Sequence, residues 1–386
     1  MDRAAETALI ERCLAQIDTG TTTLSTELAP SPVDRYLCQE RFQQEMSLIH
    51  RRLPVPYVHT SELSRPNTFR RVQTSVGDVL ITRDDSGAVH AFHNVCRHRG
   101  AGLVDAESGS ARRLVCPYHA WSYATDGALT AVPGEDPCFP NLEKDRLGLR
   151  AIPCTERFGF VWLCPDARDS VHAAERVEQH LGAMAADIAW LEMDSLQAFD
   201  RCSRRWEANW KLVSEGGLET YHFRTAHQDT IGPYFLNNLS VQDDLGGNFR
   251  VVMPLEKMRQ AAALPAAERR LRDLTHTLFT IGPQTSFLAQ AEHVDWIRMT
   301  PLAVDATEVV ITSLVPGSAD GMSAEQRRHW DTNLKITLAT LDEDFEIGES
   351  IQRGLASGTN QALTFGRNEG LLAAFNSWVE RLLQAG

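Results

Sequence analysis

Two short segments of the chain each place a cysteine close to a histidine. CRHRG at residues 96–100 holds Cys96 and His98, and CPYHAW at residues 116–121 holds Cys116 and His119. Thiolates and imidazoles at such spacing are typical metal ligands. A structural zinc site is one interpretation. Zinc fingers, however, usually take both cysteines from one segment and both histidines from another, whereas each loop here offers one of each.

This alternation favours a two-iron, two-sulfur cluster. One iron would take the two thiolates and the other the two neutral imidazoles, so that each loop touches both irons. Imidazoles in place of thiolates remove negative charge from the cluster and raise its reduction potential. We therefore predict a Rieske-type cluster held by Cys96, His98, Cys116 and His119.

A second group of polar residues lies in NWKLVSEGGLETYHFRTAH, residues 209–227, where His222 and His227 stand five apart. An H-x4-H pair alone is a weak sign of a metal. The segment is, however, rich in aromatic side chains, and polar groups buried beside aromatics require a partner or a metal. The acidic run LDEDFEIGESIQRG further along the chain can supply a carboxylate. Two imidazoles and one carboxylate on one face of Fe(II) leave positions for substrate and oxygen.

The elements that must position these residues change in type along the chain. Residues 1–50 read mainly as helix, interrupted by LAPSPVD. Short alternating segments such as FRRVQTSV and DVLITRD, with TDG as a hairpin turn, predict an all-β unit at residues 51–165. Residues 166–386 combine strands such as DWIRMTPL and EVVITSLVP with a long helix from about 323 to 353 and an amphipathic helix at FNSWVERLLQ. The predicted fold class is α+β.

Composition excludes several classes of partner. The 386 residues carry a formal net charge of −13 and a pI of about 5.5, which argues against nucleic acid or an anionic membrane as the main partner. No apolar run approaches the ~20 residues of a membrane span. The amino-terminal segment is an acidic amphipathic pattern rather than an export signal. We therefore expect a cytoplasmic protein with reduced cysteines outside the metal site.

The motifs resemble those of one enzyme family. CRHRG and CPYHAWSY, followed by DGAL, look like the Rieske domain of the Rieske non-heme iron oxygenases, catalytic (alpha) subunit, and ETYHFRTAH resembles the family's iron-binding helix. The resemblance extends from about residue 50 to 355. It implies a helix-grip catalytic domain after the Rieske domain, with His222, His227 and Asp344 as the ligands of a mononuclear Fe(II). Nearby carboxylates remain rivals to Asp344, namely Asp342, Glu343 and Glu346.

The resemblance also assigns a role to Glu219. The family residue at this position is most often aspartate and connects the two metal centres; glutamate is typical of the branch acting on quaternary amines such as carnitine and glycine betaine. The family's Asn after the upstream glutamate is replaced by Gly216. Homotrimers in which one chain's cluster lies beside its neighbour's iron are also implied. Glu219 lies three residues before His222, on the same side of a helix, and we expect it to join His222 to His119 of the neighbour.

By resemblance, the activity is O2-dependent monooxygenation, either hydroxylation or oxidative demethylation, of a small organic substrate. Electrons would come from NAD(P)H through a reductase, with or without a ferredoxin, and the chain shows no dinucleotide fingerprint of its own. Alternatives are cis-dihydroxylation of an aromatic ring and electron transfer by a Rieske carrier without oxygenase activity. Four aromatic residues could line a substrate pocket or form a cage for a cation, but ordinary core packing is favoured for each: Phe287, Trp296, Tyr234 and Phe235.

Overall fold

The computed structural model describes residues 1–282, 284–317 and 321–385. The described residues divide into two compact units, one formed by residues 51–180 and the other by residues 1–50 together with the chain from 181 onward. Our predicted limits were 1–50, 51–165 and 166–386. The unit that begins at residue 51 ends at residue 180 rather than at 165, because it includes most of helix α5 (Ser170–Leu181). Ala173 and Val177 of this helix are fully buried.

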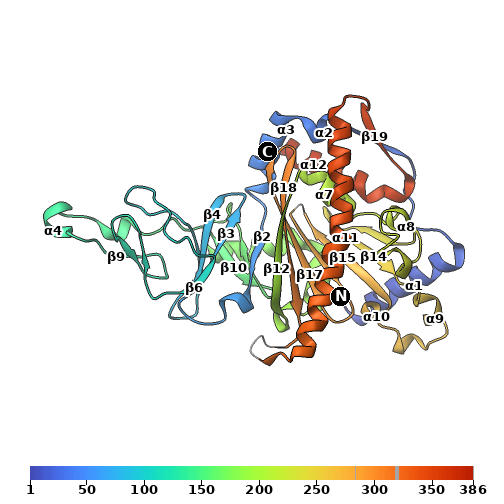
Figure 1. Ribbon diagram of the computed structural model, residues 1–386, viewed down its shortest axis with the longest axis horizontal. Helices are drawn as coiled ribbons and strands as arrows, with labels where there is room; N and C mark the ends of the chain where they lie inside the picture. Colours follow the sequence, from blue (N-terminus) through green and yellow to red (C-terminus); the bar gives the residue numbers. More distant parts are fainter. Residues whose placement is uncertain (283, 318–320, 386) are drawn as a thin grey trace. The chain divides into compact units, whose positions relative to one another are not determined.

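The unit of residues 51–180, all of them described, is built from small antiparallel sheets with strand orders β10-β11-β2, β5-β4-β3-β6 and β7-β8-β9 (Figure 1). The predicted TDG hairpin is confirmed, since the N–H of Gly127 donates to Ala124 O at 3.0 Å and Gly127 has a φ of +87°. The strands of this unit and its first α-helix are β2 Val55–His59, β3 Thr68–Thr74, β4 Gly77–Arg83, β5 Val89–His93, β6 Ser108–Ser110, β7 Leu114–Val115, β8 Ser122–Tyr123, β9 Leu129–Ala131, α4 Glu135–Cys138, β10 Cys154–Arg157 and β11 Phe160–Leu163.

In the other unit, the described residues form a seven-stranded antiparallel sheet of order β12-β18-β17-β16-β15-β14-β13. Its strands are β12 Gln197–Trp206, β13 Val241–Asp244, β14 Asn248–Pro254, β15 Thr275–Ile281, β16 Thr285–Ala289, β17 Val294–Ala303 and β18 Ala306–Val315. The helices from residue 181 onward are α6 Ala185–Trp190, α7 Trp210–Gly216, α8 Phe223–Ala226, α9 Met258–Ala261, α10 Leu271–Leu274, α11 Ala324–Ala356 and α12 Gly370–Ala385. The α+β fold class is thereby confirmed.

The long helix α11 lies across this sheet and contacts both β12 and α7 (Figure 1). Its sequence-predicted start is confirmed by a capping box, in which Ser323 Oγ accepts the N–H of Gln326 at 3.1 Å and the Gln326 side chain accepts the N–H of Ser323. Buried residues on the inner face of α11 include Leu334 and Phe345, which pack in one hydrophobic cluster with strands β17 and β18. Among the described helices, none is long and apolar enough to cross a membrane.

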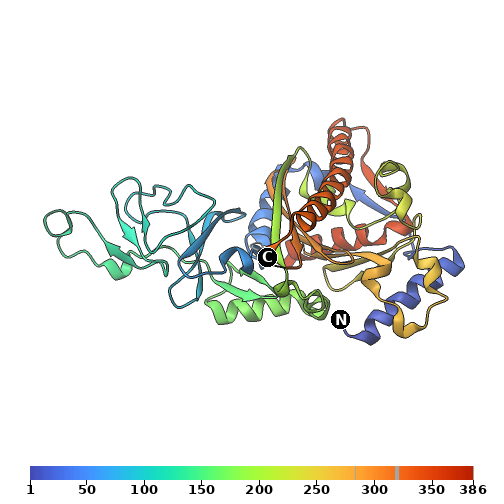
Figure 2. The ribbon, with the colours of Figure 1, turned by 60° about the horizontal axis from the view of Figure 1, so that its bottom comes forward.

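The first 50 residues belong to the same compact unit as the sheet. Helix α1 (Arg3–Thr19) buries Leu9, Ile10 and Cys13 against residues of the β13–α10 region, and Figures 1 and 2 both show it beside α9 and α10. The LAPSPVD interruption holds strand β1 (Ala29–Pro32), which pairs with β19 (Ala362–Phe365) in a separate two-stranded sheet. Proline is tolerated in such an edge strand. The helices α2 (Asp34–Leu37) and α3 (Gln39–Glu45) and a π-helical turn at Met46–His50 complete this segment.

Candidate metal centres

The two Cys/His loops have the same backbone conformation. In the first, the N–H of Cys96 donates to Ala101 O at 2.8 Å and Cys96 O accepts from Gly100 at 3.0 Å. In the second, the N–H of Cys116 donates to Trp121 O at 2.9 Å and Cys116 O accepts from Ala120 at 3.0 Å. The fourth residue after each cysteine is left-handed, with φ of +78° at Gly100 and +56° at Ala120. Each loop therefore turns back on its cysteine in the same way, although the histidine is the second residue after the cysteine in one loop and the third in the other.

The side chains of these loops fit a two-iron cluster. Cys96 and Cys116 are free thiols and are buried. The imidazoles of His98 and His119 lie 4.6 Å apart between ring centroids, and the Nδ1 atom of each is buried without a hydrogen-bond partner among the described residues. Such orphaned nitrogens require a ligand, because a buried polar atom without a partner is costly. Two thiolates and two available imidazole nitrogens are the donor set of a Rieske cluster.

A tyrosine adjoins the first loop of this candidate cluster site. Tyr123 Oη accepts the N–H of Arg97 at 3.0 Å and lies 3.4 Å from Cys96 Sγ. A cysteine that binds iron is a thiolate without a proton, so with a cluster bound the Tyr123 hydroxyl would be the donor of this contact. The ring of His98 stacks on Trp121, with centroids 4.7 Å apart. These contacts orient Cys96 and His98, which are one thiolate and one imidazole of the candidate cluster site.

The second candidate site lies where α7 gives way to α8. We expected Glu219 and His222 on one helix, and this expectation is wrong. Helix α7 ends at Gly216, and α8 begins only at Phe223, so both residues lie in the connecting turn. Glu219 holds this turn, since its carboxylate accepts the N–H groups of Tyr221 and His222. Its position next to His222 is thus set by the turn rather than by a helical repeat.

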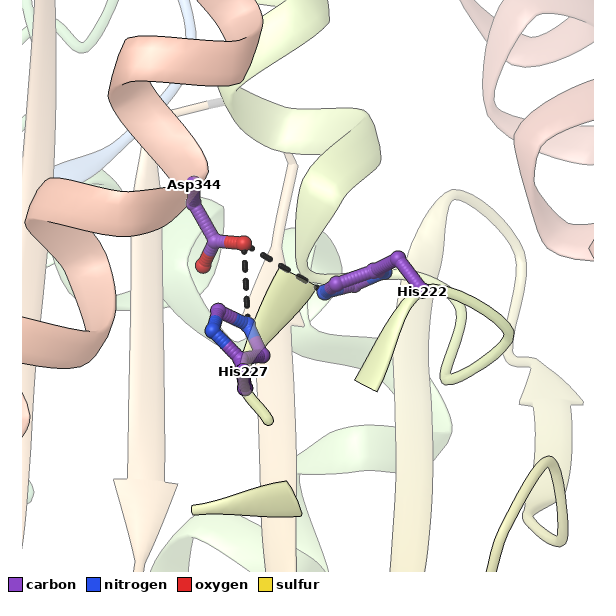
Figure 3. A group of neighbouring side chains, drawn as sticks. All are labelled: His222, His227 and Asp344. Carbon is purple, nitrogen blue, oxygen red and sulfur yellow. Dashed lines mark ion pairs between the residues drawn. The ribbon is translucent and has the colours of Figure 1, made fainter. Parts of the chain in front are cut away.

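His222, His227 and Asp344 converge on one point (Figure 3). The Oδ1 atom of Asp344 lies 3.3 Å from His222 Nε2 and 3.0 Å from His227 Nε2. One ligand atom from each of the three residues lies within 4.8 Å of the others. His222 Nε2 is buried, and its contact with Asp344 is an ion pair. Two imidazoles and a carboxylate in this arrangement fit a divalent iron with open positions.

Of the carboxylates on α11, Asp344 is the residue that the structure brings to the histidines' Nε2 atoms. Its rival Asp342 is half-exposed and lies 3.7 Å from Arg204, and Glu346 is exposed. Glu343 has another position, with Oε2 2.7 Å from His227 Nδ1 and 2.7 Å from the Thr230 hydroxyl. We did not foresee this contact.

A carboxylate therefore accompanies the outer nitrogen of each histidine. Glu219 Oε1 accepts from Nδ1 of His222, and Glu343 does so from Nδ1 of His227. An acceptor at Nδ1 fixes the proton there and directs the lone pair of Nε2 toward a metal. The four side chains thus form two carboxylate–histidine pairs around the point that Asp344 completes.

The carboxylates control protonation in this site. Burial lowers the pKa of His222, but hydrogen bonds and charges from Asp344 and Glu219 outweigh it and raise the pKa to about 10. In His227, burial is likewise outweighed by Asp344 and Glu343, and the pKa is raised. Burial raises the pKa of Asp344, but its two histidine partners bring it below the usual value. Without a metal, the carboxylates therefore keep His222 protonated at neutral pH and shift His227 in the same direction.

The triad lies in the wall of a cavity of about 470 Å³. The sheet supplies alternate residues to this wall, which face the cavity because side chains alternate along a strand: His276 and Leu278 of β15, Ser286 and Leu288 of β16, and Ile297 and Met299 of β17. Helices α7, α8, α11 and α12, strands β14 and β19 and the turns next to α8 supply further residues, including Phe223 and Phe345. A larger surface hollow of about 620 Å³ near Trp330 holds none of the predicted site residues.

Of the four aromatic residues proposed for a pocket, Phe235 lines the cavity and the other three do not. Phe287 and Trp296 are cross-strand partners on β16 and β17, buried on the opposite face of the sheet from their neighbours Ser286 and Ile297. Tyr234 is 66% exposed. Core packing, the role favoured from the sequence, is thus found for Phe287 and Trp296, because the two-residue period of a strand places neighbouring residues on opposite faces.

Comparison with protein families gives two matches along the chain. Residues 54–153 match the Rieske [2Fe-2S] domain, and residues 193–385 match the family described as "Ring hydroxylating alpha subunit (catalytic domain)". A glycine betaine monooxygenase oxygenase subunit from Chromohalobacter salexigens is 34% identical over 185 residues, which are 48% of this chain and 39% of that protein. The match thus spans well under half the length of that relative.

Solved structures share the fold. The quaternary ammonium Rieske monooxygenase CntA, in complex with an inhibitor, has a TM-score of 0.78 at 22% identity and covers 92% of this chain and 96% of its own. Naphthalene 1,2-dioxygenase from Rhodococcus sp. has a TM-score of 0.76 at 18% identity and covers 98% of each chain. These likenesses agree with the Rieske β domain and the sheet-and-helix catalytic domain described above. The chain therefore belongs to the ring hydroxylating alpha subunits, the catalytic subunits of the Rieske non-heme iron oxygenases.

Proposed function

We propose that this chain catalyses the O2-dependent monooxygenation, by hydroxylation or oxidative demethylation, of a small organic substrate. His222, His227 and Asp344 would hold the mononuclear Fe(II), and Cys96, His98, Cys116 and His119 the Rieske cluster. Electrons would come from NAD(P)H through a separate reductase, with or without a ferredoxin. The observation that carries this proposal is the convergence of the three ligands on the wall of an apolar cavity.

The cavity favours an oxygenase over a Rieske electron carrier, because electron transfer alone needs no substrate site beside a second metal. When iron and cluster are bound, they supply oxygen activation and the electrons for it. The protein's own residues hold and orient the metal ligands and the substrate. Glu219 and Glu343 fix the two imidazoles through their Nδ1 atoms, and the apolar walls hold the substrate and exclude bulk water.

Monooxygenation is favoured over cis-dihydroxylation by Glu219, because glutamate at this position is typical of the quaternary-amine branch, and a glycine betaine monooxygenase subunit is among the relatives. Dihydroxylation stays the alternative, since naphthalene 1,2-dioxygenase has the same fold. Turnover under isotopically labelled O2 separates the two. Monooxygenation places one labelled atom in the product, and two labelled hydroxyl oxygens would contradict it.

We further propose that the protein is a homotrimer and that electrons pass between chains through Glu219. Glu219 accepts from His222, and its carboxylate could also accept from His119 of a neighbouring chain, which would link the centres by hydrogen bonds. Mixed trimers test this. Chains with His98→Ala lack the cluster and chains with His222→Ala lack the iron, so each is inactive alone. Partial activity after joint reassembly is expected, and its absence in verified mixed trimers would mean that electrons stay within one chain.

A conservative variant isolates Glu219 itself. Glu219→Gln keeps the size of the side chain but removes the charge that accepts from the imidazole, so both metals should still bind. Oxidation of the reduced cluster, followed by stopped-flow absorbance, should slow by orders of magnitude. The matched control is Glu369→Gln, which changes another carboxylate of the same cavity. Equal rates in Glu219→Gln and wild type would exclude the proposed path.

A further inference from the structure

Apart from histidines, the described walls of the cavity beside the triad carry acidic groups and no basic side chains. Among the described residues that line it there is neither lysine nor arginine, whereas four carboxyl groups do line it: Glu215, Glu219, Asp344 and Glu369. The nearby Lys211 is fully buried, and its Nζ lies 2.6 and 2.8 Å from the two carboxylate oxygens of Glu45, so its charge is already paired.

An anionic substrate is therefore unsuited to this cavity. A carboxylate that leaves water requires a cationic or hydrogen-bonding partner, and the cost of burying it unpaired is large. Here it would meet carboxyl groups, with the metal as the sole counter-charge among the groups assigned to the site. A cation would have acidic neighbours, but three of the four are already engaged: Asp344 and Glu219 with the histidines, and Glu369 with the N–H of Gly366.

The fourth carboxyl group is also engaged within the protein, and its charge is reduced. Glu215 Oε1 accepts from Tyr36 Oη at 2.8 Å and from Asn376 Nδ2 at 2.7 Å. Burial raises the pKa of Glu215 to about 7, against the opposing effect of these hydrogen bonds and of Lys211. The wall therefore lacks a dedicated negative charge for a cation, and most of its remaining surface is aliphatic or aromatic.

Several polar groups of the wall are already satisfied. The hydroxyl of Ser214 donates to Trp210 O at 3.0 Å, that of Ser286 lies 3.0 Å from Thr280 Oγ1, and that of Thr340 donates to Ile336 O at 3.0 Å. Groups that are satisfied within the protein offer little to a ligand.

His276 of β15 differs from these residues. Its ring packs edge-on against Phe235, with centroids 5.1 Å apart, and it makes no hydrogen bond to a described residue. Burial lowers the pKa of His276 to about 4, so the ring is neutral at physiological pH. A neutral imidazole has one N–H donor and one acceptor nitrogen. Both are available to a molecule in the cavity that His276 lines.

We propose that the substrate of this chain is an uncharged, mainly apolar molecule that exchanges one hydrogen bond with His276, and that compounds bearing a carboxylate are excluded. This inference rests on the proposed function, because it takes the cavity as the substrate site. It defines the substrate class by its charge and by a single polar contact. His276 is a specificity-determining residue in this account and takes no part in the chemistry at the metal.

Equilibrium binding tests the charge preference without turnover. We suggest matched triplets of an amide, a carboxylate and a methylammonium compound on benzene and naphthalene skeletons, titrated by calorimetry into the anaerobic holoprotein. The amide should bind at least roughly tenfold more tightly than the carboxylate of the same skeleton, since burial of an unpaired charge costs more than 1.4 kcal/mol. Stronger binding of the carboxylate or of the ammonium compound overturns the proposal, as does failure of both amides to bind.

Variants of His276 test the hydrogen bond. His276→Leu removes both ring nitrogens and should weaken amide binding by roughly 5- to 10-fold, while binding of unsubstituted naphthalene stays within about twofold of wild type. His276→Gln keeps a donor and an acceptor and should restore most of the amide affinity. His329→Leu, on the exposed part of α11, is the matched control. Equal losses for amide and naphthalene would show a packing role and contradict the proposed contact.

The two proposals fail in distinguishable ways. Repeating the titrations with His222→Ala, which disrupts the metal site, should leave the order amide over carboxylate unchanged, because the order comes from the walls. If the binding order holds but no compound of the uncharged class supports oxygen uptake with a reductase, the proposed activity is wrong and the binding site stands. If uptake occurs with carboxylates instead, the activity stands and the substrate class is wrong.

Discussion

Oε2 of Glu343 lies 2.7 Å from Nδ1 of His227, on the side of the imidazole away from the nitrogen that faces Asp344. Two successive residues of one helix therefore serve the same histidine in different ways. Asp344 approaches the metal-facing Nε2, and Glu343 accepts a hydrogen bond from the outer nitrogen, Nδ1. The second contact fixes the tautomer that a metal needs.

This relationship predicts different effects for two neighbouring substitutions. Glu343→Gln keeps the ligands and should weaken binding of Fe(II) by about 10- to 100-fold, as loss of an outer hydrogen-bond partner does. Asp344→Asn removes the anionic ligand and should weaken it further. Competition with a chelator measures both affinities. Glu346→Gln, exposed on the same helix, is the control. An unchanged affinity in Glu343→Gln would show that the contact does not support the metal.

Local spacing indicated the Cys/His pairs and the pair of histidines, because each of these segments is short, whereas Asp344 was chosen from the family resemblance. The role of Glu343 was not predictable in this way. Adjacent residues of a helix point about 100° apart, so the run of carboxylates on α11 could not be divided into ligand and partner until the position of His227 was known.

The connection of α7 to α8 shows another limit of the sequence. A helical repeat was expected through Glu219 and His222, but Gly216 and Gly217 end α7 and the chain turns. Glycine disfavours helix interiors, which was a usable signal. Strand β1 was missed for a different reason, since its pairing with β19 joins segments more than 300 residues apart, and local patterns carry no information on such contacts.

Binding of a divalent metal to the triad should release protons. The pKa of His222 is raised to about 10, so at pH 7 this histidine is largely protonated in the metal-free chain, and the pKa of His227 is raised as well. A metal takes neutral imidazole, and its affinity should therefore fall as the pH is lowered from about 10. Calorimetry of Co(II) binding in buffers of different ionisation enthalpy should show about one to two protons released per metal at pH 7. Binding without proton release would contradict the charge state described here.

Tyr123 should raise the reduction potential of the cluster. Its hydroxyl is directed at Cys96 Sγ, and hydrogen bonds to ligand sulfur raise the reduction potential of such clusters. Tyr123→Phe should lower the potential by some tens of millivolts with the cluster content unchanged. Protein-film voltammetry measures the shift, and Tyr118→Phe, on an exposed ring, is the control. An equal or higher potential in Tyr123→Phe would mean that the hydroxyl does not donate to the sulfur.

Glu215 should make stability depend on pH. Burial raises its pKa from 4.5 to about 7, so the folded state binds a proton that the unfolded state has released between these pH values. Stability from this group is present below about pH 4.5 and is lost as the pH rises to about 7. The loss is at most about 3 kcal/mol.

Glu215→Gln removes this titration. From pH 5 to 8, the free energy of unfolding of wild type should fall relative to that of the variant, as followed by tryptophan fluorescence in urea. Glu268→Gln, on an exposed turn, should change with pH as wild type does. Parallel pH profiles for wild type and Glu215→Gln would show that the carboxyl has an ordinary pKa in the folded protein.

We infer that one chain holds two separate metal centres, one on the Cys/His loops and one on the His222–His227–Asp344 triad. Iron analysis together with electron resonance of the reduced protein tests it most directly. Wild type should contain about three irons per chain, Asp344→Ala about two with an intact Rieske signal, and Cys96→Ser about one with no Rieske signal. Two irons per chain in fully loaded wild type, unchanged by Asp344→Ala, would contradict the account.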